Sequence, residues 1–249
     1  STMAPAPSLS TTVAGVHLKT CIYNASGPRT GSSAALARIA ASESGAVLTK
    51  SATLDAQTGN PQPRTWHEPD VAKGASLNSE GLPNSGIDYY LDSQTIADSM
   101  AADPSKPYMV SISGKTLADN IAMLKKIVNH TSRIAAIELN LACPNVIGKP
   151  IIAYDFEQLK NVLAEVTKVP GISKIPLGIK MPPYFDGVQF QLAAGIINAY
   201  SSSIGYVACI NTIGNALAID IVSEAPVIAS NNGYAGLSGH AVKYTGKIG

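Results

Sequence analysis

Residues 137–145 read Ile-Glu-Leu-Asn-Leu-Ala-Cys-Pro-Asn, an apolar strand that runs directly into a polar turn. Asn140, Cys143 and Asn145 place three hydrogen-bonding or reactive groups within six residues, and Pro144 stiffens the turn that presents them. A strand that ends in amides and a thiol predicts a functional site at its carboxyl end.

The same pattern of an apolar strand with a polar end recurs along the chain. Short apolar runs at 46–50, 108–112, 134–139, 177–180 and 205–210 predict strands. Helical patterns that begin after Thr116 and Asp155, and at 189–199, separate the later strands. Strands that alternate with helices predict a parallel sheet with right-handed crossovers. The polar residues at or just beyond the strand ends are Lys50, Ser113, Asn140, Lys180 and Asn211.

Polar residues at the carboxyl ends of successive strands are typical of the active-site face of a (β/α)8 TIM barrel. A doubly wound sheet would place its ligand at a single crevice, and no GxGxxG follows the first strand. We therefore predict an α/β fold of the barrel type. Residues 51–84 form a Gly/Pro/Asn-rich excursion of the kind that usually carries function, and residues 227–229 suit an edge strand or hairpin arm.

Composition limits the classes of function. A net charge of +1 gives no reason to expect nucleic acid or an anionic membrane as partner, and no apolar run reaches the ~18 residues that span a bilayer. Charged residues make up 14%, which fits either a surface covered by a partner subunit or a neutral surface rich in Ser, Thr and Asn. The three cysteines and four histidines share no metal-ligand spacing, so no metal site is predicted.

Compartment and domain limits follow from the same reading. Unpaired cysteines suggest a reducing compartment, the cytoplasm or an organellar matrix. Residues 1–15, which start with a Ser/Thr/Ala/Pro-rich uncharged run, are expected to be a flexible tail, and residues 16–249 a single barrel domain.

The motifs now in hand resemble the class 1, fumarate-type dihydroorotate dehydrogenases. They occur in the family's order from about residue 17 to 243. The matching stretches are NASG (24–27), TKS (49–51), GNPxPR (59–64), LNSxGLPN (77–84), GIDYY (86–90), ELNLACPN (138–145), GKP (148–150), AYDF (153–156), KMPPYFD (180–186) and NTIGN (211–215).

The resemblance implies a TIM barrel that carries FMN and oxidises dihydroorotate to orotate, with fumarate as electron acceptor, in a homodimer or a larger complex. It implies that Cys143 is the base that removes the C5 proton, and that residues 148–150 belong to a mobile closing loop. The substrate would be bound by Lys50, Asn78, Gly81, Leu82, Asn140, Asn145, Asn211 and Thr212, and the cofactor by Ser26, Lys50, Ser51, Asn140, Lys180, Ile210 and Gly239.

Several positions depart from the family pattern. The family chain continues beyond the position of Gly249 with the last barrel strands and the glycine loops that hold the phosphate, so an incomplete barrel is expected. Glu80 replaces a methionine in the substrate-binding loop, Ser238 replaces a glycine beside the phosphate, and Ala142 and Thr212 replace serines. Three readings stay open: an active dehydrogenase, a catalytically inactive scaffold subunit of a larger assembly, or an FMN-binding relative with another substrate.

Overall fold

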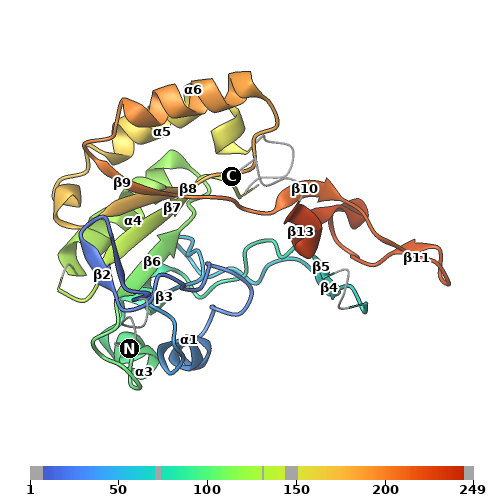
Figure 1. Cartoon of the computed structure of the whole chain (residues 1–249), viewed down its shortest axis with the longest axis horizontal. Helices are drawn as coiled ribbons and strands as arrows, with labels where there is room; N and C mark the ends of the chain where they lie inside the picture. Colours follow the sequence, from blue (N-terminus) through green and yellow to red (C-terminus); the bar gives the residue numbers. More distant parts are fainter. Residues whose placement is uncertain (1–7, 71–73, 131, 144–150, 244–249) are drawn as a thin grey trace, which may run out of the picture.

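The central feature of the computed structural model is a five-stranded parallel sheet in the order β3-β6-β7-β8-β9. The structure describes residues 8–70, 74–130, 132–143 and 151–243. Figure 1 shows α4 (Leu117–Ile127), α5 (Phe156–Val166) and α6 (Gly187–Asn198) packed along one face of this sheet. The strands are β3 (Val47–Leu48), β6 (Tyr108–Ile112), β7 (Ala136–Asn140), β8 (Leu177–Lys180) and β9 (Ile204–Ala208).

The three covering helices each begin at a side chain that caps the first turn. Thr116 and Asp119 form a reciprocal capping box, while Asp155 and Asp186 accept hydrogen bonds from backbone N–H groups of the first turn. None of the described helices is long and apolar enough to cross a membrane. The helices are α1 (Ser33–Ala40), α2 (Ile87–Leu91), α3 (Ser93–Ser99), α4 (Leu117–Ile127), α5 (Phe156–Val166) and α6 (Gly187–Asn198), with 3-10 turns η1 (Val128–His130), η2 (Ile152–Tyr154), η3 (Ile172–Lys174) and η4 (Asn231–Gly233).

The two faces of the parallel sheet bury different side chains. Val110, Ile137 and Ile179 belong to a large cluster with the helices, whereas Leu48 and Met109 belong to a separate, smaller cluster. Because side chains alternate along a strand, the smaller cluster marks the inner face, which is the barrel interior. The register aligns one inner layer across four strands: Ser111, Glu138, Gly178 and Tyr206.

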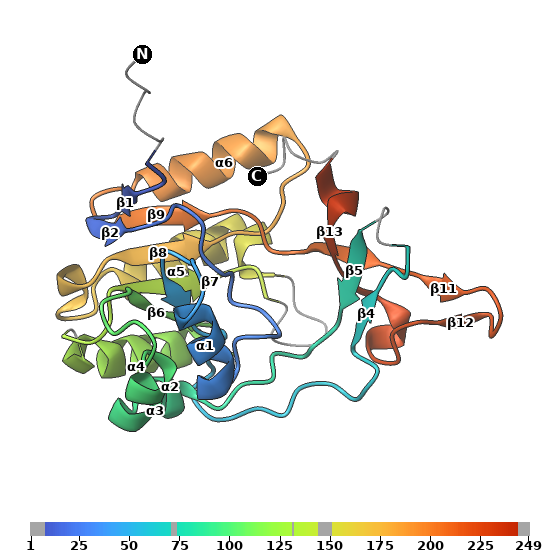
Figure 2. The ribbon, with the colours of Figure 1, turned by 60° about the horizontal axis from the view of Figure 1, so that its bottom comes forward.

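An antiparallel hairpin lies near the inner cluster. Its strands are β1 (Thr11–Val13) and β2 (Val16–Leu18), and Leu18 is buried in that cluster. Figure 2 shows the hairpin beside β9. The predicted flexible tail of residues 1–15 is therefore wrong from Thr11 onward, because this segment pairs with β2.

A second, antiparallel sheet has the order β10-β13-β5-β4. Figures 1 and 2 show it to one side of the parallel sheet, where the hairpin of β11 and β12 projects from it. Its strands are β4 (Thr65–His67), β5 (Ala75–Asn78), β10 (Ile213–Ala216) and β13 (Ala235–Gly239), and the hairpin pairs β11 (Ile219–Asp220) with β12 (Ala225–Pro226).

The second sheet corrects two expectations. The excursion at 51–84 contributes β4 and β5 and is not a structureless loop. The apolar run at 227–229 forms no strand; instead Ile228 is buried against Leu77 and Ala235, and the Ala229 N–H donates to the Pro63 carbonyl. The run is apolar because it packs against the small sheet. Hydrophobic periodicity alone does not distinguish a segment that covers a sheet from a strand that pairs within it.

Candidate functional site

A cluster of hydroxyl and amide groups, here called the hydroxyl–amide cluster, joins five segments of the chain. The Ser51 Oγ lies 2.7 Å from the Ser26 Oγ and 2.8 Å from the Ser111 Oγ. The Asn140 Nδ2 donates to the Ser51 Oγ at 3.2 Å, and the Asn211 Nδ2 donates to the Asn140 Oδ1 at 3.4 Å. The fold thus brings together four predicted site residues, with Ser111 as a fifth member.

Two buried lysines act electrostatically on Cys143. Burial lowers the pKa of both Lys50 and Lys180, and the Cys143 thiol raises each pKa in part. Burial raises the pKa of Cys143 to about 11, although Lys50, Lys180 and a hydrogen bond with Ser113 all act to lower it. The thiol is therefore protonated at neutral pH in the ligand-free protein, beside cations that would stabilise its thiolate.

Glu138 supplies a buried carboxyl beneath Lys180. It is 2% exposed, and burial raises its pKa while Lys180 acts to lower it. The register pairs Asn140 with Lys180 and Glu138 with Gly178, so the amide and the ammonium lie one layer above the carboxyl. Tyr206 occupies the space over Gly178, where a side chain would collide with its ring. In the described part of the chain, no three His, Cys, Asp or Glu side chains are arranged to hold a metal.

Glu80 forms ion pairs with two cations. Its Oε2 lies 3.7 Å from the Lys50 Nζ, and its Oε1 lies 3.6 Å from the Arg64 Nε. The side chains of Glu80 and Lys50 are 11% and 7% exposed, so little water screens the pair. The carboxylate that replaces the family's methionine therefore points at a predicted substrate-binding lysine and does not turn away.

A cavity of about 170 Å³ opens beside Lys180. It contains two of the residues predicted for the cofactor, Lys180 and Ile210. The complete lining is Tyr23, Asn24, Ala25, Leu48, Glu138, Lys180, Ala208, Cys209 and Ile210.

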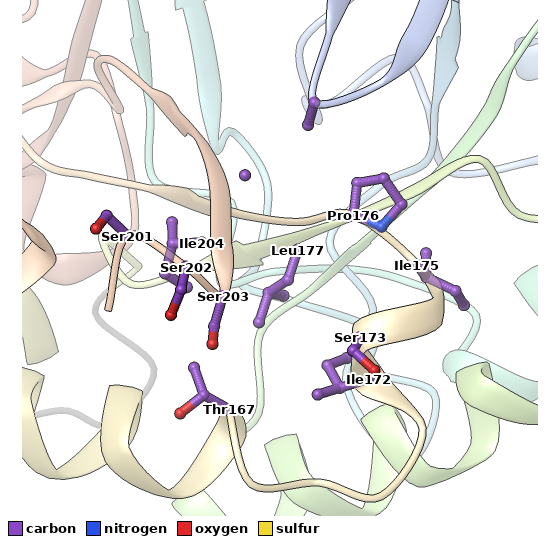
Figure 3. Close-up of a pocket in the computed structure, with 12 residues that line it drawn as sticks. Thr167, Ile172, Ser173, Ile175, Pro176, Leu177, Ser201, Ser202, Ser203 and Ile204 are labelled. Atoms are coloured by element: carbon purple, nitrogen blue, oxygen red, sulfur yellow. The ribbon is translucent and has the colours of Figure 1, made fainter. Parts of the chain in front are cut away.

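A larger cavity of about 320 Å³ lies at the opposite, amino ends of β8 and β9. Figure 3 shows aliphatic groups and the hydroxyls of Ser173, Ser202 and Ser203 around it. None of its described lining residues is ionisable, so it offers no group to move a proton or to balance a ligand's charge. We therefore place the functional site at the carboxyl ends of the strands.

Other predicted residues lie outside these clusters. Asn78 ends β5, and Gly81 and Leu82 follow in the Glu80 loop (residues 79–84), both with φ in the left-handed region. The Thr212 side chain packs over Gly236 of β13, and Gly239 pairs with Ala75 in the second sheet, away from the cavity beside Lys180.

Asn145, Pro144 and the proposed closing loop at 148–150 fall outside the described residues.

The doubt about Ser238 is resolved by its backbone. Ser238 pairs with Ser76 in an ordinary strand, and the positive φ of +88° belongs to Gly239, which is retained. A serine therefore suits position 238, because an extended backbone has no need of glycine.

Sequence reasoning missed Ser111 and Glu138, and it named Ser113 only as a polar residue at a strand end, without its contact with Cys143. The alternation of side chains along a strand could have found both. Ser111 lies two residues before Ser113, and Glu138 lies two residues before Asn140, so each shares a face with the polar residue at the end of its strand. The bond between Ser113 and Cys143 joins separate segments and carries no sequence signal.

Comparisons with known proteins identify the family of this chain. Residues 8–247 match the family model described as dihydroorotate dehydrogenase. The chain is 44% identical over 238 residues to dihydroorotate dehydrogenase A (fumarate) of Lactococcus lactis, covering 95% of this chain and 73% of that protein. It is 43% identical over 222 residues to dihydroorotate dehydrogenase (fumarate) of Lachancea kluyveri, covering 89% and 67%.

A solved structure supports the fold. The crystal structure of a ligand-free DHODH from Eimeria tenella superposes with a TM-score of 0.67 at 17% identity, covering 95% of this chain and 68% of that one. The five parallel strands are thus part of a TIM barrel, as predicted. The chain belongs to the dihydroorotate dehydrogenase family, in its fumarate type.

Proposed function

We propose that this chain carries the FMN-dependent oxidation of dihydroorotate to orotate. The observation that carries the proposal is the convergence of Lys50, Cys143 and Lys180 beside the hydroxyl–amide cluster at the carboxyl ends of the strands. A base at this place can remove a proton next to a carbonyl, and the two cations can stabilise the negative charge that forms. The fixed amide donors suit a flat ring with amide edges.

The residues beside the cavity fit the pyrimidine end of a flavin. Lys180 supplies a buried cation, and Ser26, Ser51 and Asn140 supply hydroxyl and amide groups already oriented by mutual hydrogen bonds. The cavity is also bordered by Asn24 and Ala25 and by residues 208–210. FMN held by these residues would supply the acceptor for the hydride from C6 of the substrate, and fumarate, named in the relatives' descriptions, would then take up the two electrons with two protons.

The substrate side uses amides and backbone. Asn140 and Asn211 are held by their mutual hydrogen bond, so their remaining donors and acceptors are pre-oriented toward a ligand. Asn78, Gly81 and Leu82 supply the adjoining loop. Asn145 and Thr212 complete the proposed set by family resemblance.

Cys143 removes the C5 proton, and its thiolate is the reactive form. Ser113 donates or accepts a hydrogen bond at this sulfur, and Lys50 and Lys180 stabilise negative charge there. Burial opposes ionisation, so only a small fraction of the thiol is thiolate at neutral pH in the ligand-free protein. Ser113 supplies a hydroxyl near the base in place of the one that Ala142 lacks.

A second candidate, an inactive scaffold subunit, is favoured by one observation. Glu80 already neutralises Lys50, which an anionic substrate would otherwise meet as a free cation. A subunit of this kind would keep the fold but bind neither substrate nor flavin productively.

Self-association is also proposed. The β11–β12 hairpin projects from the second sheet with Ile221 91% and Val222 89% exposed. Large exposed apolar side chains on a projecting arm suit an interface with a second copy, as in the proposed homodimer.

Anaerobic mixing with dihydroorotate separates the two functions. The dehydrogenase should be purified with visible flavin absorbance, which dihydroorotate bleaches, and Cys143→Ala should slow the bleaching by about 10²–10⁴-fold. Flavin that is retained in Cys143→Ala at the wild-type level controls for folding. Protein that never takes up FMN would instead support the scaffold.

A further inference from the structure

Glu80 bridges two cations that come from different segments of the chain. Its carboxylate lies within 4 Å of both the Lys50 ammonium and the Arg64 guanidinium. The Arg64 Nε has no hydrogen-bond partner among the described residues, so the charge of Glu80 is its main compensation. The carboxylate is thus a built-in counter-ion and not a solvated surface group.

The backbone on both sides of Glu80 is fixed. The Asn60 N–H donates to the Glu80 carbonyl at 2.8 Å, and the Asn60 Nδ2 donates to the Ser79 carbonyl at 2.9 Å. The Gln57 Nε2 donates to the Gly81 carbonyl at 2.5 Å. These bonds hold the backbone beside Glu80 in place, so rotation of the Glu80 side chain is the simplest way to move its carboxylate away from Lys50.

The charges around Lys50 determine how well a ligand with a carboxylate can bind there. The proposed function assigns Lys50 to both substrate and flavin. Because the Cys143 thiol is neutral, Glu80 is the anion nearest to Lys50 among the described residues. A ligand carboxylate must compete with Glu80 for this ammonium, and it also meets the repulsion of a second anion in a poorly screened site. A ring without a carboxylate meets neither cost.

We propose that Glu80 is a specificity-determining residue that occupies, beside Lys50, the place of a ligand's carboxylate. The inference rests on the proposed function and deepens it. Glu80 then lowers the affinity for pyrimidine rings that carry a carboxylate and leaves the affinity for neutral cyclic ureides of the same ring unchanged. Dihydroorotate binds only after Glu80 gives up its contact with Lys50.

The experiment measures the affinity of two matched ligands by isothermal titration calorimetry at low ionic strength, on the full chain as purified. Orotate is the anionic probe, and uracil is the same ring without the carboxylate. Glu80→Gln and Glu80→Met should each bind orotate at least about tenfold more tightly than wild type, equivalent to about 1.4 kcal/mol. Binding of uracil should change less than about twofold, because no ligand charge meets position 80.

Glu43→Gln is the matched control, since it removes one carboxylate at an exposed position after α1. It should alter neither affinity. The proposal is overturned if orotate gains nothing in both Glu80 variants, including the case in which orotate binds to no form, or if uracil gains as much as orotate. Failure of the proposed function appears separately, as wild-type flavin that dihydroorotate does not bleach.

Discussion

The hydroxyl–amide cluster and the Glu80 loop meet at Lys50, yet they are built in different ways. The cluster is anchored at strand ends, where alternation and register fix each side chain, and every contact in it is between neutral groups. The Glu80 loop lies on an excursion between β5 and α2 and adds a buried charge. The comparison teaches that the geometry of the cluster is set by the sheet, whereas the charge beside Lys50 depends on a loop residue.

Among the changes that test this comparison, replacing Lys180 has the largest predicted effect on the rate of flavin reduction. Lys180→Met removes the buried cation beside the proposed flavin, so flavin reduction by dihydroorotate should slow by about 10²–10³-fold. Stopped-flow absorbance measures the rate. Lys174→Met, at an exposed lysine before β8, is the matched control. A wild-type rate in Lys180→Met would show that the sheet does not set the chemistry.

The packing of the inner face gives the next effect. Gly178→Ala places a methyl group against the Tyr206 ring, which should destabilise the fold by about 1–3 kcal/mol. Gly195→Ala on the exposed side of α6, where an added Cβ meets no neighbour, should be neutral or stabilising by up to about 1 kcal/mol. Urea unfolding compares the two, and equal stability would contradict the layered interior.

The hydrogen bonds of the cluster give a smaller effect. Ser51→Ala removes the hydroxyl shared by Ser26, Ser111 and Asn140, and should weaken FMN binding about fivefold, or about 1 kcal/mol. Fluorescence titration of the apoprotein with FMN measures this affinity. Ser203→Ala, in the larger cavity, should leave this affinity unchanged. If Ser203→Ala weakens FMN binding and Ser51→Ala does not, the cofactor binds at the amino ends of the strands, which contradicts the proposal.

The projecting hairpin lies outside both regions and should have the smallest effect on folding. Ile221→Asp should change the free energy of unfolding by less than about 0.5 kcal/mol, because the side chain is exposed. It should shift a dimer toward monomer in sedimentation velocity. A wild-type protein that sediments as a monomer would remove the proposed interface.

The sequence predicted the parallel sheet well because its signals are local. Apolar runs mark the strands, and the caps at Thr116 and Asp155 mark the starts of helices. These ends are determined by residues nearby in the sequence, not by pairing with distant segments. The second sheet escaped prediction, since β5 pairs with β13, far away in the chain, and both are rich in small residues. At the site, polar residues at strand ends pointed to Asn140 and Lys180, and the family resemblance pointed to Ser51. No local rule says that Glu80 turns toward Lys50.

The pH dependence of flavin reduction tests the central claim most directly. If the Cys143 thiolate is the base, its fraction grows about tenfold per pH unit below a pKa of about 11. Flavin-loaded protein mixed anaerobically with dihydroorotate should therefore be reduced faster at each step between roughly pH 6.5 and 8.5, and Cys143→Ser should lose both the rate and its slope. A rate that is independent of pH, or a Cys143→Ser variant as fast as wild type, would contradict the account.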